Sequence, residues 1–382
     1  MGQPARAALR QRLQQACLQL VQIPSVTGDE VRMADHLEAW CRSQAVFAGE
    51  DVRRHGNGLI VGRMPEGRRP CVLLVGHTDT VPPQGGASSA AVDGDKLSGL
   101  GASDMKGAIA VMQALVENIP PADLVCDLVL VLYDREEGSY ADNGLQVLLD
   151  RHGWLGNADL AIVMEPTDNT LQLGCMGSLH ARLTFCGRAA HSARPWQGEN
   201  AIHKAGPLLV ALQRRPCLDR DVGGLIFREA LSATVAAGGG ARNVIPHRFE
   251  VNLNYRFAPV PPAEQTVDNA VAELKRIVGD AAEVAIVEVA PPGPVPSDNP
   301  LVAHLRTLGG LAVQPKQAWT DVARLAARGV DAVNFGPGMG AQAHQAGEWI
   351  SIEAMAHAYD VLARFVTTPL SELPAQTATL AT

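Results

Sequence analysis

A histidine and an aspartate separated by one residue follow an apolar segment of strand type. Residues 72–75 are Val-Leu-Leu-Val, Gly76 follows, and then come His77 and Asp79. In an extended chain, residues i and i+2 point to the same face, so both side chains can project together from the end of a buried strand. A neutral imidazole is the commonest ligand of transition metals, and a nearby carboxylate fixes its tautomer. The pair therefore indicates a metal centre.

Two further apolar segments end in acids. Residues 128–133 lead into a turn that contains Glu136 and Glu137, and residues 160–164 lead directly into Glu165. Adjacent carboxylates repel each other unless a cation neutralises them, and ligands of α/β sheets bind at the carboxyl ends of strands. Because Glu136 and Glu137 are neighbours, they point in different directions, so one can bind metal while the other faces a substrate. The alternative is a solvated acidic loop.

Asp104 and His344 both lie in glycine-rich segments. Asp104 precedes a helical pattern, where an aspartate is commonly a helix N-cap, and this segment alone favours a cap over a ligand. The segment resembles a dinucleotide-binding motif only superficially, because Asp104 stands where the third glycine belongs. His344 follows a long loop after an apolar segment, and it is either a second imidazole ligand or an ordinary loop histidine.

Taken together, the set contains two histidines and several acids. One bridging acid, one histidine and one carboxylate for each ion, and one spare glutamate would make a two-metal hydrolase. Mixed imidazole and carboxylate ligands suit Zn²⁺. Two ions roughly 3.5–4 Å apart can hold a bridging hydroxide and polarise a carbonyl group.

The elements that must position these residues alternate between strands and helices. Helical periodicity predicts helices over residues 5–22, 29–45, 105–117 and 352–365. Apolar runs predict buried strands over residues 71–75, 128–133, 160–164 and 330–335. Strands separated by helices predict an α/β sheet that is covered on both faces.

Residues 177–289 show a different pattern. Apolar and polar residues alternate over 179–185 and 249–257, which is typical of antiparallel strands with one solvated face. Helix-like segments lie at about 199–213 and 264–278. We therefore expect an inserted α+β domain of residues 177–289. The α/β domain would be discontinuous, formed by residues 1–176 and 290–382.

Composition and charge narrow the class of protein. The 382 residues are 47% apolar, carry a net charge of −8 and contain no long basic run, which argues against nucleic acid or an anionic membrane as the main partner. The seven cysteines form no Cys-x-x-Cys pair, and a scattered odd set fits a reducing compartment. The N-terminus lacks an apolar signal region, and no apolar stretch approaches the roughly 20 residues that a membrane span needs. A cytoplasmic protein is expected.

The combined motifs resemble the co-catalytic di-zinc exopeptidase and deacylase family, which includes aminoacylases, acetylornithine deacetylase and succinyl-diaminopimelate desuccinylase. The motifs are His77-Thr-Asp79, Ser103-Asp-Met-Lys-Gly107, Glu136-Glu-Gly138, Met164-Glu-Pro-Thr167 and Ala343-His344. They occur in the family's order over nearly the whole chain. The resemblance implies a di-zinc exopeptidase-type catalytic domain with an inserted lid that also dimerises, and two Zn²⁺ per subunit, replaceable by Co²⁺.

The resemblance also implies a role for each ligand. Asp104 would bridge the two zinc ions. His77 and Glu165 would complete one site, and Glu137 and His344 the other.

Three further roles follow from the same resemblance. Asp79 would orient His77, and Glu136 would be the general base that takes a proton from the bridging water. His191, in the lid, matches a histidine that stabilises the oxyanion, usually in the active site of the partner subunit. The peptide bond after Asp104 is typically cis in the family.

Within the family, the chain most resembles the succinyl-diaminopimelate desuccinylases, particularly the actinobacterial type. The common desuccinylases have Arg-Arg-Gly-Ser where this chain has Cys175-Met-Gly-Ser178, so an arginine that could pair with a succinyl carboxylate is missing. We therefore expect Arg256 and Asn243 to bind the substrate's carboxylates, because arginine pairs bidentately with a carboxylate. Ser178 and Thr320 would assist.

The expected reaction is hydrolysis of N-succinyl-LL-2,6-diaminopimelate to succinate and LL-diaminopimelate, a step of lysine biosynthesis. The alternative is deacetylation of acetylornithine or of a related acyl-amino acid, or the activity of a metallo-exopeptidase of the same family. A metal-free binding protein of the same fold fits less well, because a retired site has no need of the spare base Glu136. A nucleotide-binding oxidoreductase fits least, because its fingerprint is incomplete.

Overall fold

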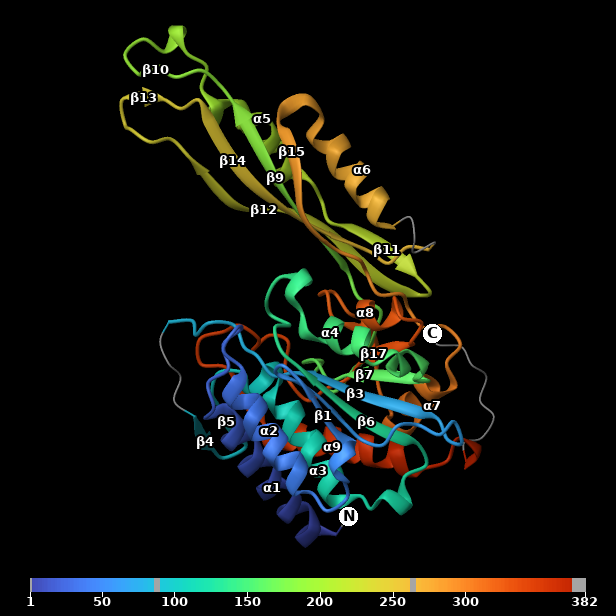
Figure 1. Ribbon diagram of the computed structural model, residues 1–382. Helices are drawn as coiled ribbons and strands as arrows, with labels where there is room; N and C mark the ends of the chain where they lie inside the picture. Colours follow the sequence, from blue (N-terminus) through green and yellow to red (C-terminus); the bar gives the residue numbers. More distant parts are fainter. Residues whose placement is uncertain (1, 86–89, 262–265, 373–382) are drawn as a thin grey trace.

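The computed structural model describes residues 2–85, 90–261 and 266–372 (Figure 1). A large α/β body holds both the start and the end of the described chain, and an elongated second part stands away from it. Within the described ranges, none of the helices combines the length and the hydropathy that a bilayer crossing needs.

The body is built on a mixed sheet of eight strands. Their order is β1 (Val52–His55), β2 (Gly58–Val61), β6 (Asp127–Tyr133), β3 (Cys71–His77), β7 (Leu160–Val163), β17 (Ala332–Asn334), β8 (Leu171–Leu173) and β16 (Val313–Pro315). The four central strands β6, β3, β7 and β17 run parallel, so their carboxyl ends meet at one edge of the sheet. Strand β3 is buried along its whole length, as expected for a parallel strand covered on both faces.

Helices cover both faces of this sheet. One face packs against α1 (Gln3–Val21), α2 (Val31–Ser43), α3 (Gly107–Asn118), α7 (Pro300–Gly309) and α9 (Ile352–Thr367). The other face packs against α4 (Gly144–Arg151) and α8 (Val322–Ala326). Alternate residues of β3 enter the two cores: Leu74 packs on the first face, and Leu73 and Val75 pack on the second.

The second part is an antiparallel sheet with helices on one face. Its strand order is β11 (Leu218–Val222), β12 (Leu225–Gly238), β14 (Arg248–Phe257), β9 (Gly177–Cys186) and β15 (Glu283–Ala290). Helices α5 (Ala201–Arg214) and α6 (Thr266–Val278) cover its apolar face. A short pair, β10 (Ala190–His191) and β13 (Val244–Ile245), forms the far tip (Figure 1). We call residues 177–290 the lid.

A small three-stranded sheet lies beside the body. It consists of β4 (Ala91–Asp93), β5 (Lys96–Ser98) and β18 (Trp349–Ser351). Just after β5, residues Ala102–Lys106 form one π-helical turn that leads into α3. The peptide bond between Asp104 and Met105 is cis, as the family resemblance predicted.

The expected helices and strands are found close to their predicted bounds. The last predicted helix of the lid, 264–278, is observed as α6; residues 264 and 265 of that range lie outside the described residues. Interpreting Asp104 as a helix cap was wrong, because the residue that precedes α3 is Lys106 and it makes no side-chain cap.

Candidate metal centre and substrate cavity

The predicted ligands meet at the carboxyl edge of the central strands. His77 is the last residue of β3, Glu136 and Glu137 follow β6, and Glu165 comes two residues after β7. His344 is reached by the loop that follows β17. Four separate strand ends thus contribute to one site, as the position of ligands in α/β sheets predicts.

The carboxylate of Asp104 lies between the two histidines. Its Oδ1 is 3.0 Å from His77 Nε2, and its Oδ2 is 3.8 Å from His344 Nε2. The Nε2 atom of His344 also lies 2.8 Å from Glu137 Oε1. Ligand atoms of His77, Asp104 and Glu137 all lie within 4.8 Å of one another. One carboxylate with an imidazole on each side is suited to bridging two cations.

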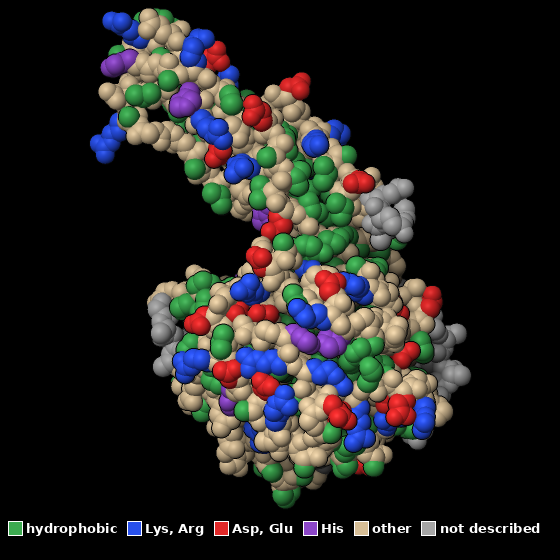
Figure 2. Space-filling view, in the orientation of Figure 1, with side chains coloured by type: hydrophobic (Ala, Val, Ile, Leu, Met, Phe, Trp, Pro, Cys, Tyr) green, Lys and Arg blue, Asp and Glu red, His purple; other side chains and the backbone are tan. Residues whose placement is uncertain are grey.

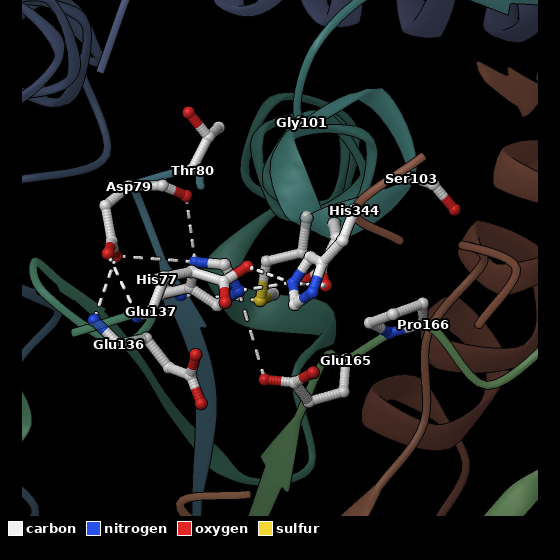
Figure 3. A network of polar contacts seen from close by, with 12 residues as sticks. His77, Asp79, Thr80, Gly101, Ser103, Glu136, Glu137, Glu165, Pro166 and His344 are labelled. Carbon is white, nitrogen blue, oxygen red and sulfur yellow. Dashed lines mark hydrogen bonds and ion pairs between the residues drawn. The ribbon is translucent and has the colours of Figure 1, made fainter. Parts of the chain in front are cut away.

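Asp79 holds the His77 side of the site together (Figure 3). His77 Nδ1 is 3.1 Å from the backbone carbonyl of Asp79 and 3.5 Å from its carboxylate. That carboxylate also accepts hydrogen bonds from the backbone N–H groups of Glu136, at 3.0 Å, and Glu137, at 3.1 Å. Arg135 has a φ of 59°, in the left-handed region, within the turn that presents both N–H groups. Asp79 therefore orients a ligand and fixes the loop that carries the two glutamates.

Glu348 holds the Asp104 side in the same manner. Its buried carboxylate accepts the backbone N–H groups of Gly101 and Ser103, each at 2.8 Å, and of Asp104 at 2.9 Å. The sequence interpretation missed this residue, although an acid directly before a short strand was visible at Glu348-Trp-Ile. Thr27 was also missed; its hydroxyl donates to Asp79 at 2.9 Å.

The donor set fits cations. Glu165 Oε1 is buried and has no hydrogen-bond partner among the described residues, and it points toward His77 Nε2 at 4.0 Å. Burial and the neighbouring carboxylate of Asp104 raise the pKa of Glu165 to about 7. On the other side, the hydrogen bond to Glu137 raises the pKa of His344 to about 9. Crowded carboxylates of this kind are stabilised by a bound cation, and imidazole with carboxylate suits Zn²⁺.

Glu136 differs from the other acids of the site. Its carboxylate accepts no hydrogen bond from the described residues, and in Figure 3 it extends toward Glu165 in the space beside His77. Burial and the charge of Glu165 raise the pKa of Glu136 well above its ordinary value. A carboxyl group with a raised pKa and no hydrogen-bond partner among the described residues is suited to exchanging a proton.

A cavity of about 360 Å³ opens in front of these acids, between the body and the lid. The molecule narrows where the two parts join (Figure 2). The body contributes Tyr140, Lys316 and Trp319 to the walls, in addition to the metal-site residues. The lid contributes the polar face of its sheet, namely Ser178, His180, Arg256 and Glu288.

The structure brings some of the predicted substrate-binding residues to the cavity and leaves others away from it. Arg256 and Ser178 line it. Thr320 is buried beside it, and its hydroxyl donates to Asn334 Oδ1 at 2.9 Å. His191 and Asn243 lie together at the tip of the lid, where Ser192 N–H donates to the carbonyl of Asn243 at 2.9 Å. Neither lines the cavity of its own chain.

Cys175, which replaces the arginine of the common desuccinylases, is fully buried. Its Sγ accepts the N–H of Gly293 at 3.2 Å and lies 3.5 Å from the carbonyl of Thr320. Burial raises the pKa of this thiol to about 11. Cys175 therefore packs under the Thr320 loop as a neutral thiol and does not line the cavity.

The model of peptidase family M20/M25/M40 matches residues 73–368, which include every predicted metal ligand. The chain belongs to peptidase family M20/M25/M40. This M20 chain is a hydrolase, and its catalytic body and lid have the architecture expected of a di-metal exopeptidase with an inserted α+β part.

Curated relatives cover nearly the whole M20 chain. A Mycobacterium tuberculosis protein, provisionally named succinyl-diaminopimelate desuccinylase DapE, is 40% identical over 353 residues, which are 91% of this chain and 96% of that protein. A succinyl-diaminopimelate desuccinylase of Corynebacterium glutamicum is 34% identical over 91% of this chain and 94% of its own length. An acetylornithine deacetylase of Myxococcus xanthus is 31% identical over 78% of this chain and 80% of its own.

Solved structures share the fold at low identity. A tripeptidase of Staphylococcus aureus superposes with a TM-score of 0.76 at 18% identity, covering 95% of this chain and 99% of its own. The Bacillus subtilis YXEP protein, described as a dinuclear metal-binding peptidase of the M20 family, superposes with a TM-score of 0.65 at 16% identity, covering 96% of this chain and 100% of its own. The predicted fold class is thereby confirmed.

Proposed function

We propose that this chain is a two-zinc amidohydrolase that removes the succinyl group from N-succinyl-LL-2,6-diaminopimelate, in the cytoplasm. The observation that carries the metal chemistry is the position of Asp104, whose two oxygens face His77 and His344. The succinyl substrate is supported by the curated relatives at 40% and 34% identity, whose names contain this activity.

The proposed metal ligands form two sets, one for each ion. His77 and Glu165 would hold one ion, Glu137 and His344 the other, and Asp104 both. When bound, the two ions would polarise the scissile carbonyl and lower the pKa of a water molecule. Asp79 keeps His77 in one orientation, which raises its basicity as a ligand.

Glu136 performs the proton transfers in this proposal. Its free carboxylate would take a proton from the attacking water as the oxygen bonds to the acyl carbon. The same proton would then pass to the leaving nitrogen as the C–N bond breaks, giving succinate and the free amine. A positioned general base contributes about 10²–10⁴-fold to the rate.

Arg256 would bind a carboxylate of the substrate. It lies on the lid wall of the cavity, and its Nε donates to Asn254 Oδ1 at 3.0 Å. Asn254 Nδ2 in turn lies 3.2 Å from Ser178 Oγ and 3.0 Å from His180 Nε2. This chain of hydrogen bonds holds the guanidinium through Nε, and neither of its two terminal nitrogens takes part in it. Thr320 would assist this binding from its buried position beneath the cavity.

The lid would join two subunits. Strand β12 pairs with β14 over residues 230–238, but β11 pairs with β12 only over residues 225–229. The rest of the outer edge of β12 is unpaired among the described residues, and residues 232–238 are exposed. An unpaired edge of small residues is a template for pairing with a second copy across a two-fold axis. In such a homodimer, His191 and Asn243 would enter the partner's cavity, where His191 could donate to the oxyanion.

The substrate is tested by comparing acyl groups on purified, zinc-loaded protein. We expect kcat/KM for N-succinyl-diaminopimelate to exceed that for acetylornithine by about 10²-fold or more, because a site that binds a carboxylate leaves its donors unpaired when the carboxylate is missing. Comparable values would exclude the desuccinylase assignment but not a zinc deacylase. The division into domains 1–176 with 290–382 and 177–289 is likewise proposed, and limited proteolysis at its boundaries would test it.

A further inference from the structure

Lys316 is a buried cation in the wall of the substrate cavity. Its side chain is 7% exposed, and Nζ donates one hydrogen bond, to the carbonyl of Pro166 at 3.3 Å. Among the described residues, no carboxylate oxygen lies within 4.0 Å of this ammonium. Its charge acts at longer range on the carboxylates of Glu165 and Asp104, but none of the described acids pairs with it directly. Burying an ammonium without a direct ion pair is costly, so the position needs an explanation.

A purely structural explanation suits another lysine of the body better. Lys106 is also buried, and its Nζ donates to the carbonyl of Ile23 at 2.9 Å. Lys106 is the last residue of the π-helical turn, which packs against α1, and it does not line the cavity. Lys316 does line it, together with Asp104, Glu165 and His344. The ammonium of Lys316 is therefore available to a bound molecule, and that of Lys106 is not.

Arg256 occupies the opposite wall. It comes from the lid, and none of the described acids pairs with its guanidinium. The acids nearest the body side of the cavity are the proposed metal ligands and Glu136, whose negative charge the two ions would offset. Glu288 on the lid wall offsets one further positive charge, and the two cations that line the cavity are then Lys316 on the body and Arg256 on the lid.

We propose that Lys316 binds a carboxylate of the substrate from the body while Arg256 binds another from the lid. This inference rests on the proposed hydrolase function and refines its substrate class. The site would select N-acyl amino acids that carry at least two carboxylates, one on each side of the cavity. Acylated amines with a single carboxylate would leave one buried cation unpaired, and such sites reject incomplete substrates strongly.

Two substitutions of Lys316 distinguish the effect of its charge from the effect of its shape. Lys316→Met removes the ammonium but keeps an unbranched apolar chain, and Lys316→Arg keeps a cation. The matched control is Lys275→Met, which removes the same charge from an exposed position on α6. Zinc content measured on each variant shows whether the metal site is intact, because Lys316 also adjoins the segment that carries Glu165.

For N-succinyl-diaminopimelate, Lys316→Met should raise KM by about 10–100-fold with little change in kcat, the effect of losing one charge-assisted hydrogen bond. Lys316→Arg should recover most of the affinity, and Lys275→Met should match the unmodified protein. Two ions per chain should remain in each.

Two altered substrates show which carboxylate of the substrate Lys316 binds. If Lys316 binds the succinyl carboxylate, the N-acetyl analogue should lose its sensitivity to Lys316→Met. If it binds a carboxylate of the amino acid, N-succinyl-1,5-diaminopentane should lose that sensitivity instead. Equal sensitivity of every substrate, an unchanged KM, or loss of zinc from Lys316→Met would overturn the inference.

A binding measurement keeps this result separate from the proposed reaction. Calorimetric titration of the zinc-loaded protein with each product, succinate and diaminopimelate, needs no turnover. Lys316→Met should weaken binding of succinate by about 10-fold or more if Lys316 binds the succinyl carboxylate, and binding of diaminopimelate by as much if it binds a carboxylate of the amino acid. If the unmodified protein released no succinate from its substrate, the proposed function would fail. Equal affinity of the two proteins for both products would instead contradict the role of Lys316.

Discussion

The backbone N–H of Asp104 donates a hydrogen bond of 2.9 Å to Oε1 of Glu348, 244 residues further along the chain. The same carboxylate binds the N–H groups of Gly101 and Ser103. The residue proposed to bridge two metal ions is thus held in place by an acid that is not among the proposed ligands. Partners of ligands often matter nearly as much as the ligands.

Glu348→Ala should therefore weaken metal binding as well as the fold. The substitution leaves three buried N–H groups without an acceptor, and each such group costs about 1–3 kcal/mol. We expect a lower free energy of unfolding by denaturant and about 10–100-fold weaker zinc binding. Glu353→Ala, which removes a partly exposed acid paired with Arg6 and Arg10, serves as the control and should leave zinc affinity unchanged. Unaltered zinc affinity in Glu348→Ala would contradict the positioning role.

Glu136→Gln should separate catalysis from metal binding. The amide keeps the size of the side chain but cannot accept a proton from water. Activity should fall by about 10²–10⁴-fold, while two zinc ions per chain remain by elemental analysis. Loss of both ions from a folded variant would show that Glu136 is a ligand and not the base.

Arg256→Ala should reduce kcat/KM for the succinyl substrate sharply without changing zinc content. A buried charge-assisted contact to a carboxylate is worth about 1.5–3 kcal/mol, equivalent to about 10–100-fold. Arg182, on the neighbouring strand β9, provides the control, since Arg182→Ala removes an exposed arginine of the same sheet outside the cavity. If the two substitutions changed kcat/KM equally, Arg256 would not be a substrate-binding residue.

Subunit mixing tests whether His191 acts in the partner's cavity. His191→Ala and Glu136→Ala homodimers should each be nearly inactive. After exchange, the mixed dimer contains one cavity with both an intact Glu136 and an intact His191, so activity should recover partially. Exchange proven by differently tagged subunits, with no recovery, would rule out sharing between subunits.

The sequence predicted much of the site because its signals are local. An apolar strand followed by a polar residue marks a carboxyl edge, and the parallel strands β3, β6 and β7 then place His77, Glu137 and Glu165 together. Asp104 was harder to interpret, because its segment reads as an ordinary helix start although it adopts a π-helical turn with non-helical dihedrals at Asp104 and Met105. Nothing in its own neighbourhood reveals that its carboxylate faces two distant histidines.

Other features could not be predicted from the spacing of apolar and polar residues. The three N–H contacts of Glu348 and the burial of Lys316 depend on how separate loops pack, and no spacing in the chain encodes them. The helices α4 and α7 were also not predicted, since they are short, with eight and ten residues. The hairpin of β11 and β12 was not predicted either, because residues 232–238 of β12 are exposed and mostly small. By contrast, the position of Arg256 on the polar face of the lid sheet follows from strand alternation, which places Asn254 on the same face.

Stepwise reconstitution with zinc tests the central proposal most directly. The protein is stripped with a chelator, titrated with Zn²⁺, and assayed for release of succinate from N-succinyl-LL-2,6-diaminopimelate at each addition. The proposal predicts no succinate release by the stripped protein, recovery on adding zinc, and two bound ions per chain at full activity. Succinate release that persists without metal, or full activity with a single bound ion, would contradict the two-metal desuccinylase.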